Sequence, residues 1–305
     1  MNEPKVFIII LNYNTINDTL ECISSLENID YSNYEIVVVD NSETMNCYNS
    51  LKNKFNEYKI IKANENLGYA NGNNIGIKYA LDNGADYICV LNNDVVVEKD
   101  FLSKIVKILN QNKDVGIAGP CICEYKDGNK VQCAGANISL YTGLTKRIGR
   151  GMLYDNINKE NVDVDFLGGA SFVCKREVFE KVGLIPENYF LFFEETEFCI
   201  KAKKNGYRLL CVYGSKVYHK GSSTISKFSG LSYYFLNRNR VVFIKRNCNV
   251  IQKIAFSIYI FIEAIGRIII RKEPKLLIRN LICGFKADIN SVSLKERNQF
   301  IKQRK

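Results

Sequence analysis

The sequence predicts a doubly wound, mostly parallel α/β sheet, because strand-like and helix-like segments alternate along its first 120 residues. Aliphatic runs typical of strands occupy residues 5–11, 34–40, 58–62 and 87–91. Segments with helical spacing of apolar residues lie between and after these runs, at residues 15–26, 71–83 and 100–110. In sheets of this kind, ligands bind beyond the carboxyl ends of the strands.

The residue pattern justifies each element in turn. The first aliphatic run is continuous, as expected of a parallel strand that is buried on both faces. In the first helical segment, Leu20, Ile23 and Leu26 face one way, and in the second, Ile75 and Tyr79 share one side. Residues 121–229 are less regular, with short apolar runs, several glycines and one further helix at Arg176–Val182.

The last quarter of the chain has a different character. Its polar residues recur every four positions on one stripe of a helix that is otherwise Ile, Phe and Ala: Tyr259, Glu263, Arg267, Arg271 and Lys275. The longest uninterrupted apolar run, residues 254–262, is well short of the roughly 20 residues that span a bilayer. This pattern predicts an amphipathic helix.

Charge divides the chain at the same place. Residues 1–229 carry 26 Lys and Arg against 28 Asp and Glu, whereas residues 230–305 carry 16 against 4. We therefore expect a catalytic or binding domain over 1–229 and a C-terminal segment over 230–305 that lies on an anionic membrane. Packing against another domain or subunit, including an oligomer, is the alternative. Nucleic-acid binding is not expected, because the first 229 residues carry no basic groove.

The cysteines and the first residues of the chain indicate a compartment. The eleven cysteines show no metal-binding spacing and lie mainly in apolar stretches, as expected of free thiols in a reducing environment. The chain runs from a short polar start directly into a strand, without a basic leader. We therefore expect a cytoplasmic protein.

Polar clusters follow three of the predicted strands: Asn12-Tyr13-Asn14, Asp40-Asn41 and Asn92-Asn93-Asp94. A carboxylate at the position of Asp40 could accept hydrogen bonds from the N–H groups of a uracil or thymine ring, although a turn residue that caps the next helix is the simpler alternative. Asp94 could bind Mg²⁺ or Mn²⁺ together with a diphosphate, because these cations take carboxylate and phosphate oxygens.

A stretch rich in glycine and asparagine extends from Asn66 through Gly68 and Asn71 to Asn74. Glycine lets the backbone approach a ligand closely, and asparagine amides both donate and accept hydrogen bonds. A plain loop would not need so many amides, so this pattern favours ligand contact.

Three carboxylates, those of Glu194, Glu195 and Glu197, follow an aromatic run. In a partly desolvated site one of them would have a raised pKa and could take a proton from a sugar hydroxyl, whereas the alternative is a helix N-terminus enriched in acids. The single histidine, His219, lies at the end of another strand-like run, and a lone histidine is more often structural than a ligand.

These segments, in this order, resemble the inverting family-2 glycosyltransferases of the GT-A fold, in particular the bacterial rhamnosyltransferase-like branch. The matching stretches cover roughly residues 5–245: FIIILNYN, IVVVDNS, NENLGYANGNNIGIKYAL, ADYICVLNNDVVV, FLGGASFVCKREVFEKVG, YFLFFEETEFCIKAKKNGY, VYHKGSS and YYFLNRNRVVF. The resemblance implies a nucleotide-sugar half over 1–120 and an acceptor and base half over 121–229.

The resemblance also implies roles for individual residues. Glu195 would be the catalytic base, and Asp94 with His219 would hold a divalent cation, Mg²⁺ or Mn²⁺, in a motif whose first acid is here Asn92. The residues implied to line the nucleotide sugar are Asn12, Asn14, Asp40, Asn66, Gly68, Asn71, Asn92, Asn93 and Arg238. Those implied to line the acceptor are Gly168, Gly169, Ala170, Glu194 and Glu197.

The function that this resemblance implies is transfer of a sugar, with inversion, from a dTDP-rhamnose-like or UDP-hexose donor to a hydroxyl of a lipid-linked or growing surface polysaccharide, at the inner face of the cell membrane. A catalytically impaired scaffold subunit is the alternative, because Asn92 and Glu195 depart from the family pattern. A sugar-nucleotide pyrophosphorylase is not favoured, because the first strand is followed by Asn12-Tyr13-Asn14-Thr15 instead of a glycine-rich phosphate loop.

Overall fold

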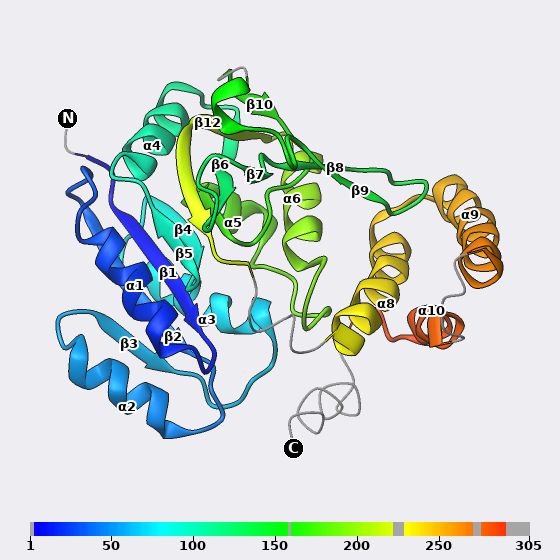
Figure 1. Ribbon diagram of the computed structural model, residues 1–305, viewed down its shortest axis with the longest axis horizontal. Coiled ribbons are helices and arrows are strands. Elements are labelled where there is room, and N and C mark those ends of the chain that lie inside the picture. Colours follow the sequence, from blue (N-terminus) through cyan, green and yellow to red (C-terminus); the bar gives the residue numbers. More distant parts are fainter. Residues whose placement is uncertain (1–2, 158–159, 222–228, 271–275, 291–305) are drawn as a thin grey trace.

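The computed structural model describes residues 3–157, 160–221, 229–270 and 276–290 (Figure 1). The strands of its ten-stranded sheet are β1 (Val6–Asn12), β2 (Tyr34–Asp40), β3 (Lys59–Lys62), β4 (Tyr87–Asn92), β5 (Val95–Val97), β6 (Val115–Glu124), β7 (Val131–Cys133), β10 (Val162–Asp163), β11 (Ser171–Lys175) and β12 (Arg208–His219). A separate two-stranded sheet pairs β8 (Ala136–Ile138) with β9 (Thr145–Arg147). The helices are α1 (Ile16–Leu26), α2 (Met45–Lys54), α3 (Tyr69–Asp82), α4 (Phe101–Gln111), α5 (Arg176–Val182), α6 (Glu194–Lys204), α8 (Ser229–Asn247), α9 (Val250–Ile269) and α10 (Leu276–Lys286).

The predicted doubly wound sheet is confirmed in the N-terminal half. Strand β1 is central: it pairs in parallel with β2 and with β4, and β3 continues the parallel part beyond β2. The second half adds β11, which runs antiparallel between β4 and β6, and then β12, which is parallel to β6. The sheet is therefore mixed, and its strand order is β10-β12-β6-β11-β4-β1-β2-β3.

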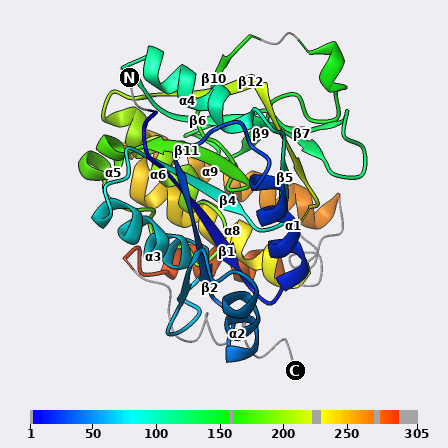
Figure 2. The same cartoon turned by 90° about the vertical axis from the view of Figure 1, so that its left-hand side faces the viewer.

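Helices cover both faces of the sheet (Figures 1 and 2). Side chains alternate between the faces along each strand, so in β1 Ile8 and Ile10 join the core beneath α1 and α4, while Phe7 and Ile9 join the core beneath α3, α5 and α6. All these side chains are fully buried, which explains the continuous aliphatic run in the sequence.

The packing of α3 differs from the face expected. Its buried side is centred on Gly72, Gly76 and Ile77, whereas Ile75 and Tyr79 are only partly buried. A Cβ added at Gly72 would lie 2.4 Å from a Leu11 methyl, so the small residues let the helix sit close to the sheet. Hydrophobic spacing alone could not indicate this, because glycine adds no hydrophobicity.

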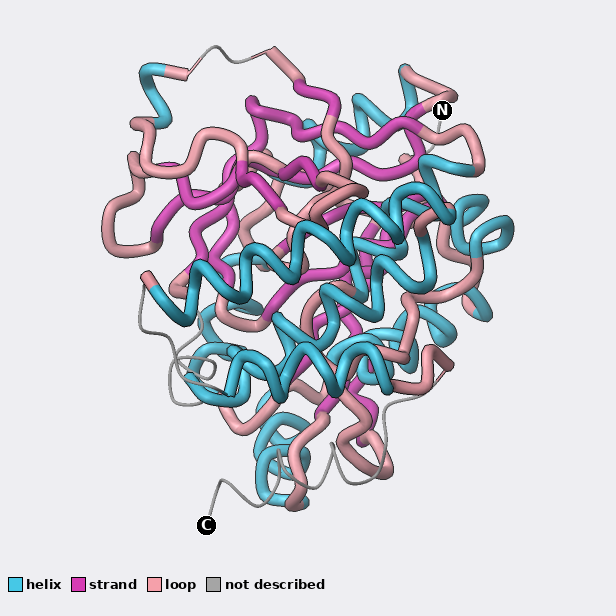
Figure 3. Tube along the Cα trace, turned by 90° about the vertical axis from the view of Figure 1, so that its right-hand side faces the viewer, coloured by secondary structure: helices cyan, strands magenta, loops and turns pink. Residues whose placement is uncertain are grey.

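The three C-terminal helices form a layer of their own beside α6 (Figures 1 and 3). They share a core in which Phe243 of α8, Phe256 of α9 and Leu277 of α10 are almost fully buried, together with Tyr189 and Phe193 from the segment before α6. The predicted helix is confirmed as α9. The last two residues of its predicted polar stripe, Arg271 and Lys275, lie outside the described residues.

Candidate active site

The carboxyl ends of β1 and β2 carry a buried polar cluster. Asn12 and Asp40 are opposite each other in the strand register, and both are fully buried. Asn12 Nδ2 donates to Asp40 Oδ1 at 2.8 Å, and Ser42 Oγ donates to the same oxygen at 2.6 Å. The backbone N–H of Asn14 donates to Ser42 Oγ at 3.0 Å. Within the described residues Asp40 Oδ2 accepts no hydrogen bond and faces Lys62 Nζ at 3.4 Å.

A second amide pair borders this cluster. Asn41 Nδ2 donates to Asn66 Oδ1 at 2.9 Å, and the same oxygen accepts the backbone N–H of Gly68 at 3.0 Å. Gly68 has a φ of +101°, and a Cβ added there would lie 2.4 Å from the carbonyl oxygen of Phe190. Only glycine suits this position, which is where the segment before α6 meets the nucleotide half.

Asp94 and His219 meet because of strand pairing. Val95 in β5 is opposite His219 in β12, and the backbone N–H of Lys220 donates to the Asp94 carbonyl at 3.0 Å. His219 Nε2 lies 3.2 Å from Asp94 Oδ1, and within the described residues this buried nitrogen has no hydrogen-bond partner. Nδ1 of the same ring lies 2.6 Å from Gln132 Oε1, so Gln132 contacts Nδ1 while Nε2 faces Asp94.

These donor atoms fit a divalent cation. Carboxylate oxygen suits Mg²⁺ and Mn²⁺, and a neutral imidazole nitrogen is a common metal ligand. Among the residues that the structure describes, however, no group of three or more His, Cys, Asp or Glu side chains is placed to hold a metal ion. Asp94 and His219 would thus supply two ligands, and phosphate oxygens or water the others.

Glu195 lies against the loop before β11. A Cβ added at Gly169 would lie 1.8 Å from Glu195 Oε1 and 2.9 Å from Tyr69 Oη. Tyr69 Oη donates to the Gly169 carbonyl at 2.7 Å and lies 3.2 Å from Asn92 Oδ1, while the backbone N–H of Asn92 donates to the Ala170 carbonyl at 2.9 Å. Tyr69 therefore connects the end of β4, the loop before β11 and the start of α6.

Burial raises the pKa of the carboxylates in this cluster, so they keep their protons to a higher pH than usual. Burial raises the pKa of Glu195 to about 7. Burial and then the charge of Glu195 raise the pKa of Glu194, which is 2% exposed. Burial, followed by the negative charges of Glu195, Glu194 and Asp94, raises the pKa of the Tyr69 hydroxyl. The charges of Asp94 and Glu195 thus both affect the pKa of Tyr69, although about 100 residues separate these two acids in the sequence.

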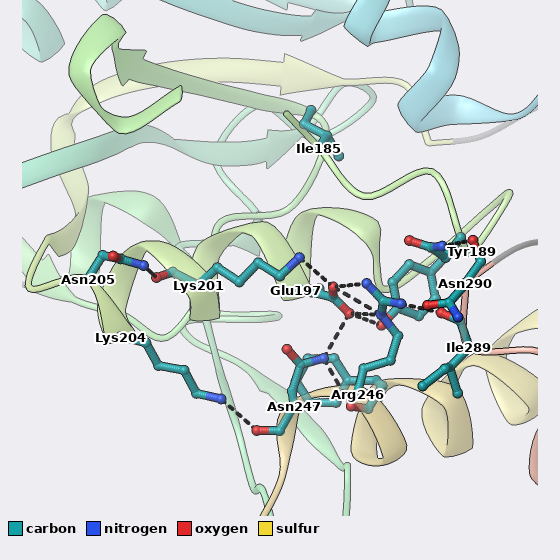
Figure 4. A network of polar contacts seen from close by, with 12 residues as sticks. Ile185, Tyr189, Glu197, Lys201, Lys204, Asn205, Arg246, Asn247, Ile289 and Asn290 are labelled. Carbon is teal, nitrogen blue, oxygen red and sulfur yellow. Dashed lines mark hydrogen bonds and ion pairs between the residues drawn. The ribbon is translucent and has the colours of Figure 1, made fainter. Parts of the chain in front are cut away.

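Glu197 points toward Arg246 and Asn247 of α8 (Figure 4). Its carboxylate is completely buried and accepts from Arg246 Nε and Nη2 at 2.9 and 2.8 Å, and from Asn247 Nδ2 at 2.8 Å. Tyr189 Oη donates to it as well, and Lys201 Nζ pairs with it at 2.8 Å. Hydrogen bonds from Arg246 and Lys201 outweigh burial and lower the pKa of Glu197 to about 2. Glu197 therefore links α6 to α8, and its carboxylate oxygens are occupied by these partners.

The aromatic segment before α6 has an unusual backbone. Phe190, Phe192 and Phe193 have φ values of 67°, 68° and 77°, in the left-handed region that side chains other than glycine seldom adopt. Asn239 of α8, which is fully buried, holds this segment: its Nδ2 donates to the carbonyls of Tyr189, Leu191 and Phe192 at 3.0, 2.7 and 3.0 Å. Strain of this kind is typical of functional sites, and here it sets the position of Glu194 and Glu195.

Two of the other predicted residues have polar partners within the protein. Asn93 Nδ2 donates to Thr19 Oγ1 at 2.9 Å, and that hydroxyl donates to Asn12 Oδ1 at 2.9 Å, so Asn93 joins the end of β4 to that of β1. Asn71 Nδ2 donates to Glu187 Oε2 at 3.0 Å.

Arg238 and Gly168 have opposite surroundings. Arg238 is completely buried in α8, where its Nη1 donates to Asn239 Oδ1 at 2.7 Å. By contrast, a Cβ added at Gly168 would meet no described atom within 4 Å, so this position borders open space.

Sequence reasoning missed four residues that organise the site: Asn41, Tyr69, Gln132 and Asn239. Asn41 and Tyr69 lie inside motifs that the sequence analysis identified. In the first motif only Asp40 was given a role, and in the second only the glycine and asparagine residues were. Asn239 is the neighbour of Arg238, which was chosen for its charge. Gln132 lies in a stretch without any recognisable motif, so only the fold could reveal its contact with His219.

The chain is similar in sequence to known hexosyl- and rhamnosyltransferases. The hexosyltransferase Agl10 of Haloferax volcanii, which acts in low-salt glycan biosynthesis, is 28% identical over 65% of this chain and 61% of its own length. The dTDP-rhamnosyl transferase RfbF of Shigella flexneri is 24% identical over 80% of this chain and 81% of its own. The rhamnosyltransferase WbbL of Escherichia coli is 24% identical over 67% and 79%, respectively.

Solved structures share the fold at low identity. The mannosyltransferase PcManGT of Pyrobaculum calidifontis, in complex with GDP-Man and Mn²⁺, covers 100% of this chain and 80% of its own with a TM-score of 0.58 and 15% identity. GalNAc-T7 with UDP, GalNAc and Mn²⁺ covers 79% of this chain and 51% of its own with a TM-score of 0.58 and 19% identity. The predicted GT-A fold is thereby confirmed. The family model for glycosyl transferase family 2 matches residues 7–183, more than half of the sequence, and the chain therefore belongs to that family.

Proposed function

We propose that this protein transfers a sugar from a nucleoside-diphosphate sugar to a hydroxyl group, with inversion at the anomeric carbon. The observation that supports this most is the position of the Glu195 carboxylate, which lies against Gly169 with a pKa of about 7. A carboxylate of this pKa is available as a base at neutral pH, and such a base typically contributes about 10²- to 10⁴-fold in rate.

In the proposed reaction, Glu195 accepts the proton of the acceptor hydroxyl. The hydroxyl oxygen attacks the anomeric carbon from the face opposite the diphosphate, and the bond to the diphosphate breaks with its electron pair on the leaving group. One displacement of this kind inverts the anomeric centre. Tyr69, which donates to the Gly169 carbonyl, would keep the loop in register with the base.

Asp94 and His219 would hold the cation, and Gln132 would keep His219 Nε2 unprotonated for it. A bound Mg²⁺ or Mn²⁺ would offset the negative charge that develops on the diphosphate. Asn92 replaces the first acid of the family motif and supplies no charge, so we expect a weaker cation site than two carboxylates would make. Its amide contacts Tyr69 instead.

We assign the donor to the ends of the parallel strands. Asp40 and Asn12 would meet the base, and Asn14, Asn66, Gly68 and Asn71 would border the nucleoside, with Asn92 and Asn93 nearer the diphosphate. The buried Asp40 Oδ2 and the amide cluster around Asn66 support this assignment. We leave Arg238 out of it because its guanidinium donates to Asn239 within α8.

We assign the acceptor to the loop of Gly168, Gly169 and Ala170, next to Glu195 and with Glu194 behind it. Glu197 has no part in this assignment, since its carboxylate is used in the contact with α8. The name of RfbF favours a dTDP-rhamnose-like donor and that of WbbL a rhamnosyl donor. The name of Agl10 specifies only a hexosyl group, and we keep a UDP-hexose as the other donor in the proposal. We further propose a lipid-linked or growing surface polysaccharide as acceptor, at the cytoplasmic face of the membrane.

Regarding the membrane, none of the helices in the described part of the chain combines the length and the apolar character needed to span a bilayer. We propose that residues 1–229 form the transferase domain and that residues 230–305 associate with the membrane peripherally. The excess of basic residues in this last segment, 16 against 4 acidic, supports the division.

A panel of UDP- and dTDP-sugars, each with and without Mn²⁺, tests the donor site by thermal unfolding. A donor at 100 times its Kd should stabilise the protein by about 2.7 kcal/mol. Asp94→Asn should abolish the part that depends on Mn²⁺, whereas the matched variant Asp100→Asn, at an exposed carboxylate paired with Lys104, should not. No stabilisation by any donor would overturn the proposal.

Glu195→Gln separates catalysis from binding. Calorimetry should give a donor affinity close to that of the unmodified protein, and a donor-consumption assay should detect no transfer. Turnover near the normal rate would refute the role of Glu195. Donor binding without turnover in the unmodified protein would instead favour the scaffold alternative.

A further inference from the structure

Helix α9 is attached to the protein by its polar side. Glu263 of α9 accepts from Arg240 Nη2 and Nη1 of α8 at 2.9 and 3.1 Å, and Arg267 Nη1 donates to Glu263 at 3.2 Å. The stripe expected from the sequence therefore faces the protein. Only two large apolar side chains of this helix, Phe256 and Ile260, are buried with it.

The opposite side of α9 is apolar and exposed to solvent. Phe261 is 67% exposed and Ile269 is 70% exposed, and the outward side chains of the helix follow helical spacing: Val250, Ile251, Ile254, Ile258, Phe261, Ile262, Ile265 and Ile269. Helix α10 adds Ile278, Ile282 and Phe285. We call these eleven residues the apolar face; α9 and α10 lie at the edge of the molecule in Figure 1.

Exposed apolar area on this scale marks a surface that contacts an apolar partner. Single apolar residues scattered over a surface are normal, but eight large ones in a row along one helix are not. The polar contacts of Glu263 fix the helix in this orientation, so the apolar face cannot turn inward without breaking a buried ion pair.

In the sequence of this last segment, basic residues outnumber acidic ones. From residue 249 to the end, the sequence carries 12 Lys and Arg against 4 Asp and Glu, and one of the four acids, Glu263, is already paired with Arg240. Two of the bases, Arg279 and Lys286, are exposed on α10 itself. A second copy of this chain would bring like charges together, because a two-fold interface joins the same patch on both subunits. Anionic lipid headgroups would neutralise them.

We propose that the apolar face of α9 and α10 inserts into the surface of an anionic membrane, with both helices lying in the plane of the interface. Glu263 and Arg267 of α9 remain on the protein side, and Arg279 and Lys286 of α10 contact the headgroups. A helix of 20 residues extends about 30 Å, so α9 would lie along the surface over its whole length.

This orientation deepens the proposed function. Arg240 joins α9 to α8, and α8 reaches the base through the contact of Arg246 with Glu197 and through Asn239 at the aromatic segment. The membrane face and the start of α6 are thus linked by a continuous series of buried contacts. The inference about a lipid-linked acceptor rests on the proposed function; the binding of the membrane does not.

The absence of tryptophan from the sequence makes a direct test possible. Ile262→Trp places a single indole on the apolar face, and Met45→Trp places one on α2, where Met45 is similarly exposed. With vesicles of phosphatidylcholine and phosphatidylglycerol, the emission of the first variant should shift to the blue and be quenched by brominated lipid. The second should not change.

Vesicle flotation measures the affinity independently of catalysis. The triple variant Ile254→Gln, Ile258→Gln, Phe261→Gln should bind about tenfold or more weakly, while Met45→Gln, Met152→Gln, Leu153→Gln, which changes three exposed apolar residues elsewhere, should bind normally. Arg279→Gln with Lys286→Gln should reduce the preference for phosphatidylglycerol over pure phosphatidylcholine.

Two results would overturn the proposal. One is unchanged flotation of the triple variant. The other is a protein that does not float but elutes as a dimer, which the triple variant converts to a monomer; this would assign the apolar face to a second copy. Because donor binding and turnover of the same variants can be measured without vesicles, a failure here is distinguishable from a failure of the transferase proposal.

Discussion

Replacement of Gly169 by alanine should disable the base without affecting the donor site. The new Cβ would lie 1.8 Å from Glu195 Oε1 and 2.9 Å from Tyr69 Oη, whereas carbon and oxygen pack at roughly 3.4 Å. The carboxylate would have to retreat by about 1.5 Å. A misplacement of about 1 Å can lower a rate about 100-fold, which corresponds to about 2.7 kcal/mol in the barrier.

Gly214 in β12 supplies the control. A Cβ added there would lie 3.9 Å from Lys104 Cδ, an ordinary contact, and its φ is not in the left-handed region, so Gly214→Ala should keep kcat within about twofold. The assay is kcat and donor KM for both variants, with the melting temperature of each as a check on folding. Equal kcat for the two variants, or a fall in kcat explained by unfolding, would refute the reasoning.

Two further predictions concern the contacts that hold the site. Asn239→Ala removes the amide that holds three carbonyls of the strained segment. We expect kcat to fall about 10- to 100-fold while the donor KM stays unchanged. The control is Asn237→Ala, whose amide donates to a carbonyl of its own helix and whose loss should lower kcat far less. Glu197→Gln leaves the guanidinium of Arg246 without its charged partner. Denaturant unfolding should show a loss of about 3–5 kcal/mol in the free energy of unfolding. The control Lys201→Met, which removes a half-exposed partner of Glu197, should cost under about 1 kcal/mol. Because the folded pKa of Glu197, about 2, lies below its usual 4.5, its stabilisation is present above pH 4.5 and is lost as the pH falls toward 2; a Glu197→Gln protein that loses stability over this range as the unmodified one does would contradict the assignment.

Local patterns predicted the elements near the site well. The strand ending in Asp40 and the helix Arg176–Val182 have the predicted bounds, because continuous aliphatic runs and helical spacing depend on neighbouring residues alone. The expectation that Asp94, His219 and Glu195 gather at one site came from the family resemblance. The β5–β12 register places Asp94 beside His219, and the charges of Glu195 and Asp94 both raise the pKa of the Tyr69 hydroxyl.

The sequence could not predict which residues, distant along the chain, each side chain contacts in the fold. Three acids begin α6, and periodicity does not say that Glu195 faces Gly169 while Glu197 meets Arg246. Nor does it say which side of α9 is buried. An apolar side is normally the inner one, but Arg240 of α8 binds Glu263 and turns the polar stripe inward.

The pH dependence of kcat tests the central claim, that Glu195 is a base adjusted by burial, most directly. With a pKa of about 7, the rate should fall tenfold per pH unit below neutrality and reach about 1% of its plateau near pH 5, where a carboxylate of ordinary pKa would still be about three-quarters ionised. Glu195→Gln should remove this rate and, above pH 7, raise the free energy of unfolding by about 1–3 kcal/mol, because a folded pKa above the usual 4.5 makes stability decline as the pH rises through 7. A profile that stays flat down to pH 5, with turnover surviving in Glu195→Gln, would contradict the account.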